Sequence, residues 1–327
     1  MTDYGMDEAD AHHVHAATTA GSDWVEVLTG LAERDEEAAG QSGAGAELWH
    51  RAAVSLIFAQ LIDNFDVDRK VAINRRMTED FMKFAAGASL PTRKIALDFQ
   101  GGKLFGWHVK PLQKSRGAVL VFGGLSGWST AYRAIAEALV GQGLECVLAD
   151  GPGQGETRME GGIFAGRHTV PGFSRFIDYL ESETGFDRFG IWGNSFGGLF
   201  AALTAAADRR IGACCINGAP ARVEPPAFRT PAEQLAAIFG SQTLDACGDA
   251  MEILTFDPAR QRLECAVKVI EGSADPLVPL GAQDIFLTGN EHPLSGKLSW
   301  ADGEHTIYNH AAERNRLASA WFRDCLA

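Results

Sequence analysis

Apolar positions between residues 23 and 90 recur at helical spacing. They predict helices over residues 24–38, 47–63 and 67–86, separated by breaks that contain Gly, Asp or Asn. The middle helix is apolar nearly all round, which is typical of a helix packed between other elements. Residues 1–22 are polar and show no sustained period, so we expect a flexible acidic tail there, followed by an N-terminal helical domain over 23–90.

Beyond Pro91 the apolar positions change to a period of two. Residues 94–99 and 104–110 flank Gln100-Gly101-Gly102 and predict a β-hairpin. Short apolar runs then alternate with helical segments; the runs are 118–122, 145–149, 189–192, 211–216, 266–271 and 297–300. This alternation is typical of a mostly parallel sheet with helices on both faces, so we expect an α/β domain over 91–327.

One interval interrupts the alternation of strands and helices. It covers about 219–262 and contains helical stretches near 231–239 and 244–254. Such a length is too great for a simple crossover in a compact domain. We therefore predict a helical cap inserted into the α/β domain.

Charge is distributed unevenly along the chain. The net charge is −13, and the first 50 of the 327 residues hold eleven acidic residues and one basic residue, Arg34. The remainder is almost neutral and has no basic stripe, which argues against nucleic acid and an anionic membrane surface as partners.

The six cysteines form no C-x-x-C pair, so we expect neither a disulfide framework nor a bound metal. With no apolar signal segment and no apolar run near the ~20 residues of a membrane span, we expect a cytoplasmic protein.

A nucleophile motif follows the apolar run 189–192. Gly193-Asn194-Ser195-Phe196-Gly197 has the G-x-S-x-G pattern and is followed by a helix of small residues. In a nucleophile elbow the serine occupies a strained turn between strand and helix, and its flanking positions must be small for the two to pack closely. Ser195 is therefore the candidate nucleophile.

A serine nucleophile needs a histidine to accept its proton and an acid to orient that histidine. Asp275 follows the run 266–271, and His305 follows the last run, so both stand where the α/β-hydrolase order of Ser, acid and His requires them. Asp150 also follows a strand, but its loop is rich in Gly and Pro, and we expect it to hold that loop by local hydrogen bonds.

The oxyanion of an acyl-transfer intermediate needs two backbone N–H donors. Phe196, which follows the nucleophile, is expected to supply the first. The glycine-rich loop after the run 118–122 offers the second, and we favour Leu125, with Gly124 as the next choice. Ser126 in the same loop is a weaker nucleophile candidate because it lacks the second spaced glycine.

Three motifs together carry a family resemblance: Asp150-Gly-Pro-Gly-Gln-Gly-Glu156, the elbow around Ser195, and Gly303-Glu-His305-Thr-Ile-Tyr-Asn309. The sequence resembles the 2,6-dihydroxypseudooxynicotine hydrolase-like α/β-hydrolases, over most of its length. The resemblance implies an α/β-hydrolase fold preceded by a helical domain. It also implies relatives among fungal polyketide-shortening hydrolases, which hydrolyse a carbon–carbon bond next to a ketone with a triad that falls on Ser195, Asp275 and His305.

Three functions are compatible with these residues. The first is a cofactor-independent serine hydrolase that cleaves a carbon–carbon bond beside a ketone in a small aromatic or conjugated substrate. The second is a carboxylesterase, lactonase or acyltransferase that uses the same triad, and the third is a non-catalytic binding protein on a hydrolase scaffold. The apolar helices before residue 90 also suit packing on a second copy of the chain, so a homodimer is a further expectation.

Overall fold

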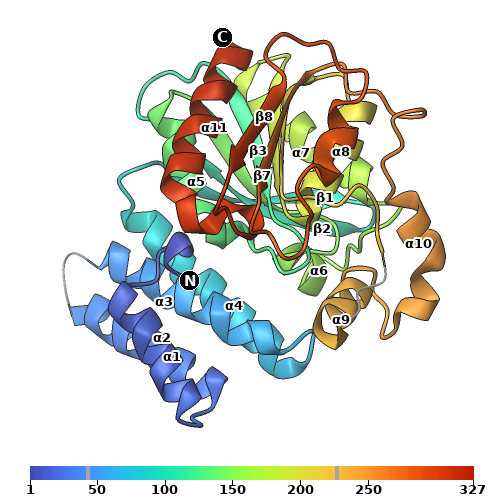
Figure 1. Cartoon of the computed structure of the whole chain (residues 1–327). Coiled ribbons are helices and arrows are strands. Elements are labelled where there is room, and N and C mark those ends of the chain that lie inside the picture. The colour runs from blue at the N-terminus through green and yellow to red at the C-terminus, as the bar shows by residue number, and fades with distance from the viewer. Residues whose placement is uncertain (42–44, 225–227) are drawn as a thin grey trace.

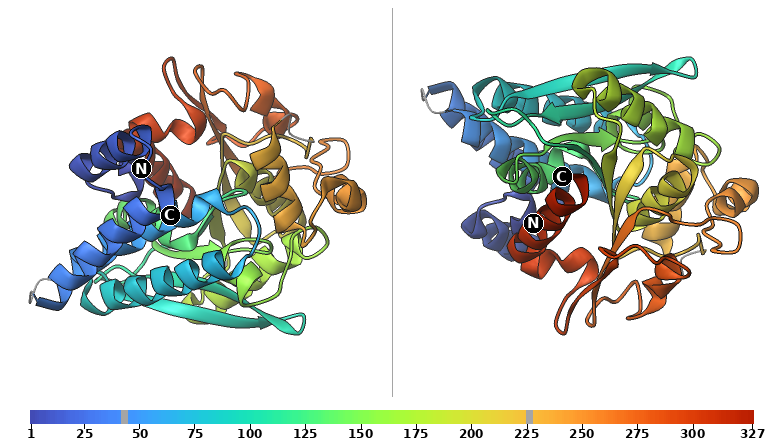
Figure 2. Two further views of the ribbon diagram at one scale, coloured as in Figure 1. Left: turned by 90° about the horizontal axis from the view of Figure 1, so that it is seen from below. Right: turned by 90° about the horizontal axis from the view of Figure 1, so that it is seen from above.

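The computed structural model describes residues 1–41, 45–224 and 228–327. Residues 42–44 of the predicted helical domain and 225–227 of the predicted cap lie outside the described residues. The molecule consists of an α/β body with the N-terminal helices packed below it (Figure 1). The helices of the cap region and the first helices of the chain lie on opposite sides of the molecule (Figure 2).

An eight-stranded sheet forms the centre of the α/β body, as the apolar runs predict. Its order is β1-β2-β4-β3-β5-β6-β7-β8, and only β2 runs against the other strands. The strands are β1 (Thr92–Phe99), β2 (Gly102–Val109), β3 (Ala118–Phe122), β4 (Glu145–Asp150), β5 (Phe189–Asn194), β6 (Ile211–Asn217), β7 (Ala266–Gly272) and β8 (Gly296–Trp300). This topology is the α/β-hydrolase fold, which confirms the predicted fold class.

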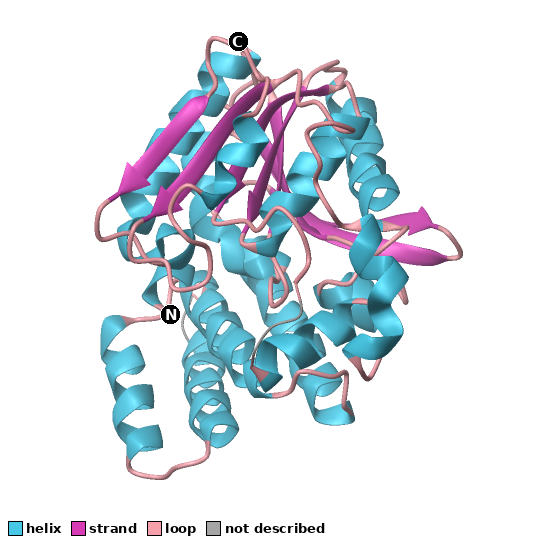
Figure 3. Cartoon of the chain, turned by 45° about the vertical axis from the view of Figure 1, so that its right-hand side comes forward, coloured by secondary structure: helices cyan, strands magenta, loops and turns pink. Residues whose placement is uncertain are grey.

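Helices cover both faces of the twisted sheet (Figure 3). One face carries α5 (Arg133–Gly141) and α11 (Ala311–Leu326), and the other carries α7 (Thr169–Thr184) and α8 (Phe196–Ala207). Successive residues of β3 point to opposite faces: Val119 and Val121 belong to one apolar cluster, whereas Leu120 belongs to the other. Because both faces are covered there, the central strands β3 to β7 are buried almost throughout, whereas the edge strands β1 and β8 alternate.

The N-terminal helices share one of these two apolar clusters with the sheet. They are α2 (Trp24–Gln41), α3 (Ala46–Ala59) and α4 (Asp68–Gly87), with the short 3₁₀ helix η2 (Gln60–Ile62) between the last two. As predicted for the middle helix, α3 packs between its neighbours and is buried from Ala52 to Ala59. Phe81 of α4 packs edge-on against Trp107 of β2, with ring centroids 4.7 Å apart. The core is therefore continuous across the predicted domain boundary at residue 90.

The expectation of a flexible tail over residues 1–22 is wrong. This segment contains η1 (Thr2–Tyr4) and α1 (Glu8–Thr19), and the side chains of Met6 and Val14 are buried. Helix α1 has one buried apolar residue, so it lacks the apolar stripe by which a helix is recognised in a sequence.

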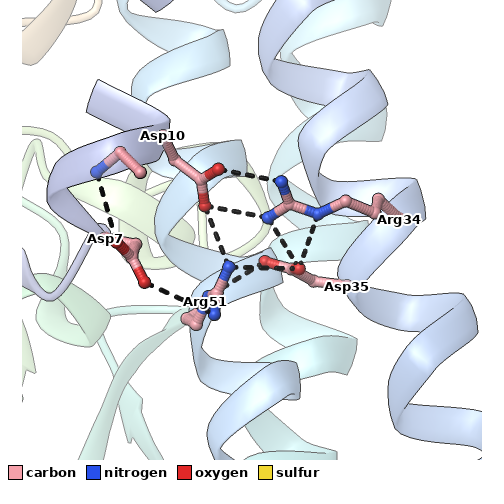
Figure 4. A network of polar contacts seen from close by, with 6 residues as sticks. Asp7, Asp10, Arg34, Asp35 and Arg51 are labelled. Carbon is pink, nitrogen blue, oxygen red and sulfur yellow. Dashed lines mark hydrogen bonds and ion pairs between the residues drawn. The ribbon is translucent and has the colours of Figure 1, made fainter. Parts of the chain in front are cut away.

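Ion pairs attach α1 to its neighbours instead (Figure 4). Both carboxylate oxygens of Asp10 lie 2.8 Å from the guanidinium nitrogens of Arg34 in α2. Arg51 in α3 lies 2.9 Å from Asp10 and 3.2 Å from Asp35. Asp10, one of the acidic residues that suggested a solvated tail, therefore helps to hold this segment against α2 and α3.

The remaining helices are short and stand near the carboxyl ends of the parallel strands. They are η3 (Ser129–Tyr132), α6 (Gly155–Met159), α9 (Arg229–Ile238), η4 (Leu244–Cys247), α10 (Gly248–Ile253), η5 (Ala282–Leu287) and η6 (His305–His310). In the described parts of the predicted cap, α9, η4 and α10 follow β6. Among the helices described, none has the length and apolar character needed to cross a membrane.

Candidate active site

Ser195 occupies the sharp turn between β5 and α8. Its φ and ψ are 55° and −133°, a conformation that side chains other than glycine rarely adopt. A Cβ atom at Gly193 would overlap the carbonyl oxygen of Gly197, so only a residue without a side chain fits there. The N–H of Ser195 donates to the carbonyl oxygen of Asn217 at 2.7 Å, which ties the turn to the end of β6. The motif thus forms the elbow expected from its glycine spacing.

The structure brings Ser195, His305 and Asp275 into one hydrogen-bonded chain. His305 Nε2 lies 2.8 Å from Ser195 Oγ, and His305 Nδ1 lies 2.9 Å from Asp275 Oδ2. The Asp275 side chain is 3% exposed and that of His305 is 19% exposed. A buried acid, a histidine and an accessible serine at these distances are equipped for proton transfer from serine to histidine.

Asp275 is held ionised by its surroundings. Burial alone would raise its pKa, but hydrogen bonds and charge interactions with His305, and the N–H groups of Leu277 and Val278, lower the pKa below its usual value. Those N–H groups donate to Asp275 Oδ1 at 2.8 and 3.0 Å. The carboxylate therefore stays available to orient His305 well into the acid range.

The loop that carries His305 is fixed by contacts to its backbone. Thr306 and Ile307 have φ values of 57° and 58°, unfavourable for β-branched residues. The carbonyl oxygen of Thr306 accepts hydrogen bonds from Asn217 Nδ2 at 3.0 Å and from Arg314 Nη1 at 2.6 Å. These contacts hold a strained loop in the position that aims His305 at Ser195.

The loop after β3 approaches the elbow, as the oxyanion-hole prediction requires. A Cβ atom at Gly124 would lie 2.9 Å from the backbone nitrogen of Phe196, so the two backbones are almost in contact. Among the described residues, neither the N–H of Leu125 nor that of Phe196 donates to a protein acceptor. Phe196 is the first residue of α8, and Leu125 lies in the turn after β3, so both N–H groups are free to donate to a negatively charged oxygen.

Gln154 is a site residue that the sequence reasoning missed. Its side chain is 2% exposed, and its Nε2 donates to the carbonyl oxygens of Gly123 and Gly124, the latter at 3.0 Å. Its Oε1 accepts from the N–H of Gly151 at 2.9 Å. By binding both carbonyls, Gln154 fixes the loop that presents Leu125. The signal was present, because Gln154 lies within the motif that carried the family resemblance.

Asp150 holds its loop by local hydrogen bonds, as expected. Its carboxylate accepts from the N–H of Ser129 at 2.7 Å and from that of Glu156 at 3.0 Å. Burial raises its pKa to about 6, although these two N–H groups act in the opposite direction. Asp150 therefore links the turns on either side of the site, and His305 Nδ1 donates its hydrogen bond to Asp275 instead.

A cavity of about 230 Å³ opens over Ser195 and His305. Its lining comes from the first residues, the loop after β3 with η3 and α5, the elbow, the start of α9, the loop after Asp275, and the segment from His305 to the first turn of α11. The lining includes Asp3, Tyr4, Leu125, Ser126, Ala131, Tyr132, Ile135, Pro231, Gln234, Leu277 and Arg314. Ser126 is thus on the cavity wall, whereas the histidine is paired with Ser195. Within the described chain, no cluster of three or more His, Cys, Asp or Glu side chains is arranged to hold a metal ion.

Comparisons with known proteins agree with this fold. A family model described as serine aminopeptidase, S33 matches residues 113–263. The solved structure of a 2,6-dihydroxy-pseudo-oxynicotine hydrolase aligns with a TM-score of 0.86 at 21% identity, covering 100% of this chain and 95% of that chain. The structure of AbyA5 aligns with a TM-score of 0.75 at 17% identity, covering 97% of this chain and 94% of that chain.

An esterase from Pyrococcus furiosus is also similar, with a TM-score of 0.55 at 16% identity, covering 74% of this chain and 96% of that chain. No curated protein matches the chain. The chain therefore has the α/β-hydrolase fold, and the resemblance to the 2,6-dihydroxypseudooxynicotine hydrolase is confirmed at the level of that fold. The matching family and the enzymes among these neighbours support a hydrolase.

Proposed function

We propose that the protein is a cofactor-independent serine hydrolase that cleaves a carbon–carbon bond next to a ketone in a small aromatic or conjugated substrate. The observation that carries the hydrolase part is the chain of contacts Ser195–His305–Asp275, at 2.8 and 2.9 Å, below a cavity. A carboxylate, a histidine and a strained serine in this arrangement serve nucleophilic acyl transfer.

The choice of bond rests on the resemblance and on the cavity. Similarity to the 2,6-dihydroxy-pseudo-oxynicotine hydrolase extends over the whole chain, including the N-terminal helices, whereas the Pyrococcus esterase covers 74% of it. Tyr4 and Tyr132 are among the aromatic side chains of the cavity wall. An aromatic or conjugated substrate suits such walls, because flat rings pack on flat rings.

In the proposed reaction, Ser195 Oγ attacks a ketone carbon and its proton passes to His305 Nε2. The N–H groups of Leu125 and Phe196 donate to the oxyanion that forms. When the tetrahedral intermediate collapses, the carbon–carbon bond breaks and its electron pair passes into the leaving fragment as an enolate, which His305 protonates. Water, deprotonated by His305, then hydrolyses the acyl group on Ser195.

The leaving fragment must carry its negative charge on oxygen, since an isolated carbanion is too basic to depart. A 1,3-dicarbonyl substrate meets this condition because its second carbonyl accepts the electron pair, and an aryl ketone meets it when its ring carries an oxygen conjugated with the breaking bond. The proposal therefore predicts that turnover depends on a carbonyl or aryl group conjugated with the breaking bond.

A substrate panel tests this function. With 1-phenylbutane-1,3-dione we expect hydrolysis to a ketone and a carboxylic acid, detected by liquid chromatography and mass spectrometry, and loss of both products in Ser195→Ala. Ready cleavage of p-nitrophenyl acetate with no ketone fragment from any β-diketone would assign an esterase instead. Transfer of the acyl group to added benzylamine in preference to water would assign an acyltransferase.

A further inference from the structure

The cavity contains a buried positive charge that takes no part in the reaction steps proposed above. Arg314, in the first turn of α11, lines the cavity and is 6% exposed. Its Nε and Nη2 donate to Asn315 Oδ1 at 3.0 and 2.8 Å, and its Nη1 donates to the carbonyl oxygen of Thr306 at 2.6 Å. All of these acceptors are neutral. They use three of the five N–H bonds of the guanidinium, which leaves two.

A buried guanidinium without an anion is energetically costly, because the protein interior solvates charge poorly. Among the described residues, no carboxylate lies within ion-pair distance of Arg314, in contrast to Arg158, whose guanidinium is 2.7 Å from Asp66. Burial lowers the pKa of Arg314, and the negative charge of Asp3, also on the cavity wall, opposes that shift. An arginine nevertheless remains protonated, so its charge is uncompensated at close range.

Two phenols stand beside this charge. Tyr4 and Tyr132 line the same cavity, with ring centroids 6.0 Å apart in an edge arrangement. Burial raises the pKa of Tyr4 to about 12 and raises that of Tyr132 well above its usual value, so both hydroxyls are protonated. A Cβ atom at Gly123 would overlap the Tyr132 hydroxyl, which places this hydroxyl against the oxyanion loop. One cation and this pair of protonated phenols thus line a cavity that also contains Ser195.

We propose that Arg314, flanked by Tyr4 and Tyr132, forms a subsite for an oxygen anion of the substrate, next to the nucleophile. The inference rests on the proposed function and names the group that the site binds. During carbon–carbon cleavage this anion is the enolate oxygen of the leaving fragment. The electron pair of the broken bond passes to that oxygen, Arg314 holds it, and His305 then returns the proton taken from Ser195 to the enolate carbon. A carboxylate already present in the substrate has the same chemistry and would bind there as well.

Arg314 also contacts the loop of His305, so a purely positioning role is the competing explanation. Such a role would affect every reaction of the triad equally. An anion subsite affects reactions in which an oxygen anion occupies it, and leaves other acyl transfers much less changed. The two roles are therefore distinguished by comparing affinities for charged and neutral ligands, and kcat values for two substrates.

Binding without turnover tests the subsite directly. In Ser195→Ala, calorimetry should show that 3-phenylpropionate binds about 10- to 100-fold more tightly than 3-phenylpropionamide, as expected for a charge-assisted contact. Adding Arg314→Gln should abolish this preference, and adding Arg314→Lys should retain part of it, because lysine keeps the charge and loses the planar fork. Equal affinity for acid and amide in Ser195→Ala itself would overturn the proposal, even if Arg314→Gln does not fold.

Turnover identifies the source of the anion. For Arg314→Gln we expect kcat for 1-phenylbutane-1,3-dione to fall about 10²–10³-fold relative to kcat for p-nitrophenyl acetate, if the subsite stabilises the departing enolate. If the ratio of the two kcat values is unchanged but the preference for 3-phenylpropionate over 3-phenylpropionamide is lost, the subsite is supported and its ligand is a carboxylate of the substrate. Equal loss of both reactions with unchanged carboxylate binding would overturn the subsite in favour of positioning. Absence of diketone cleavage by the wild type refutes the proposed function alone, since the binding result still decides the role of Arg314.

Discussion

Backbone strain in this protein is concentrated at single residues of the site. Of the four non-glycine residues described with positive φ, three are Ser195, Thr306 and Ile307. The strain at Ser195 is predictable, because the spacing of its glycines announces the turn. The strain at Thr306 and Ile307 is not predictable, because β-branched residues disfavour this conformation and contacts from distant residues, Asn217 and Arg314, help to maintain it.

Asp275 provides a prediction at this scale. Asp275→Asn should lower kcat about 10⁴-fold, because an amide favours the wrong tautomer of His305. Folding should be preserved, since the amide oxygen can still accept from the N–H groups of Leu277 and Val278. Asp302→Asn is the matched control: Asp302 also follows the last strand but pairs with His310 at 2.9 Å, and its loss should leave kcat near the wild-type value. Similar losses in both variants would remove Asp275 from the triad.

Gln154 shows what sequence reasoning could not assign. The motif marked the residue, but its hydrogen bonds to Gly123 and Gly124 depend on a loop about thirty positions away in the chain. Gln154→Leu should lower kcat at least about 10-fold, because the donors of the oxyanion hole lose their fixed position, with a smaller change in KM. Gln142→Leu, which removes an acceptor of Arg323, is a control outside the site. Unchanged kcat in Gln154→Leu would contradict the role of this residue.

Elements were predictable where apolar residues define them. The runs that became β3 to β7 are buried on both faces, so their composition indicated strands, and the hairpin turn at Gln100 and Gly101 has the positive φ values that such a turn requires. Helix α1 was not predicted, because ion pairs and not an apolar stripe hold it in place. The division of the chain at residues 22 and 90 stays a prediction, and the shared apolar cluster indicates that the helical part does not have a core of its own.

Helix α3 carries a histidine whose titration should be visible in stability. Burial lowers the pKa of His50 to about 3, and the charge of Arg133 contributes, against a smaller opposing effect of Glu47. The folded state therefore binds fewer protons than the unfolded state between pH 3 and 6.5, so stability falls as pH decreases through this window.

Relative to His50→Leu, the free energy of unfolding of the wild type should fall by about 3 kcal/mol from pH 7 to pH 4.5. Urea denaturation of both proteins at the two pH values measures this difference. Leucine has a similar size and no ionisable group, so the comparison cancels the titration of other residues. A difference that does not change with pH would show that His50 has the same pKa in the folded and the unfolded protein.

At the scale of the whole molecule, the fold holds the first residues of the chain beside the cavity. Asp3 and Tyr4 line the cavity, and the contacts of Asp10 with Arg34 and Arg51 anchor the helix that follows them. Neither the cavity contact nor the anchoring of α1 could be predicted from the sequence, because the apolar residues of 1–22 show no helical period that would indicate a packing surface. The expected homodimer likewise stays a prediction.

Arg51→Met should release α1, because it removes the cation shared by Asp7, Asp10 and Asp35. Limited proteolysis should then cleave within residues 1–22 about tenfold faster, the equivalent of about 1.4 kcal/mol, and KM should rise because Tyr4 leaves the cavity wall. Arg69→Met is the control, because among the described residues this helical-domain arginine forms an ion pair with Asp63 only. Equal cleavage rates in the two variants would contradict the anchoring of α1.

The most direct test of the account as a whole is intact-protein mass spectrometry of wild type and Ser195→Ala after mixing with 1-phenylbutane-1,3-dione, with a fluorophosphonate probe in a parallel sample. We predict a transient acyl adduct that maps to Ser195 in the wild type, free ketone in the same sample, and neither adduct nor probe label in Ser195→Ala. Ketone release that persists in Ser195→Ala, or a folded wild type that takes up neither acyl group nor probe, would contradict a Ser195 nucleophile.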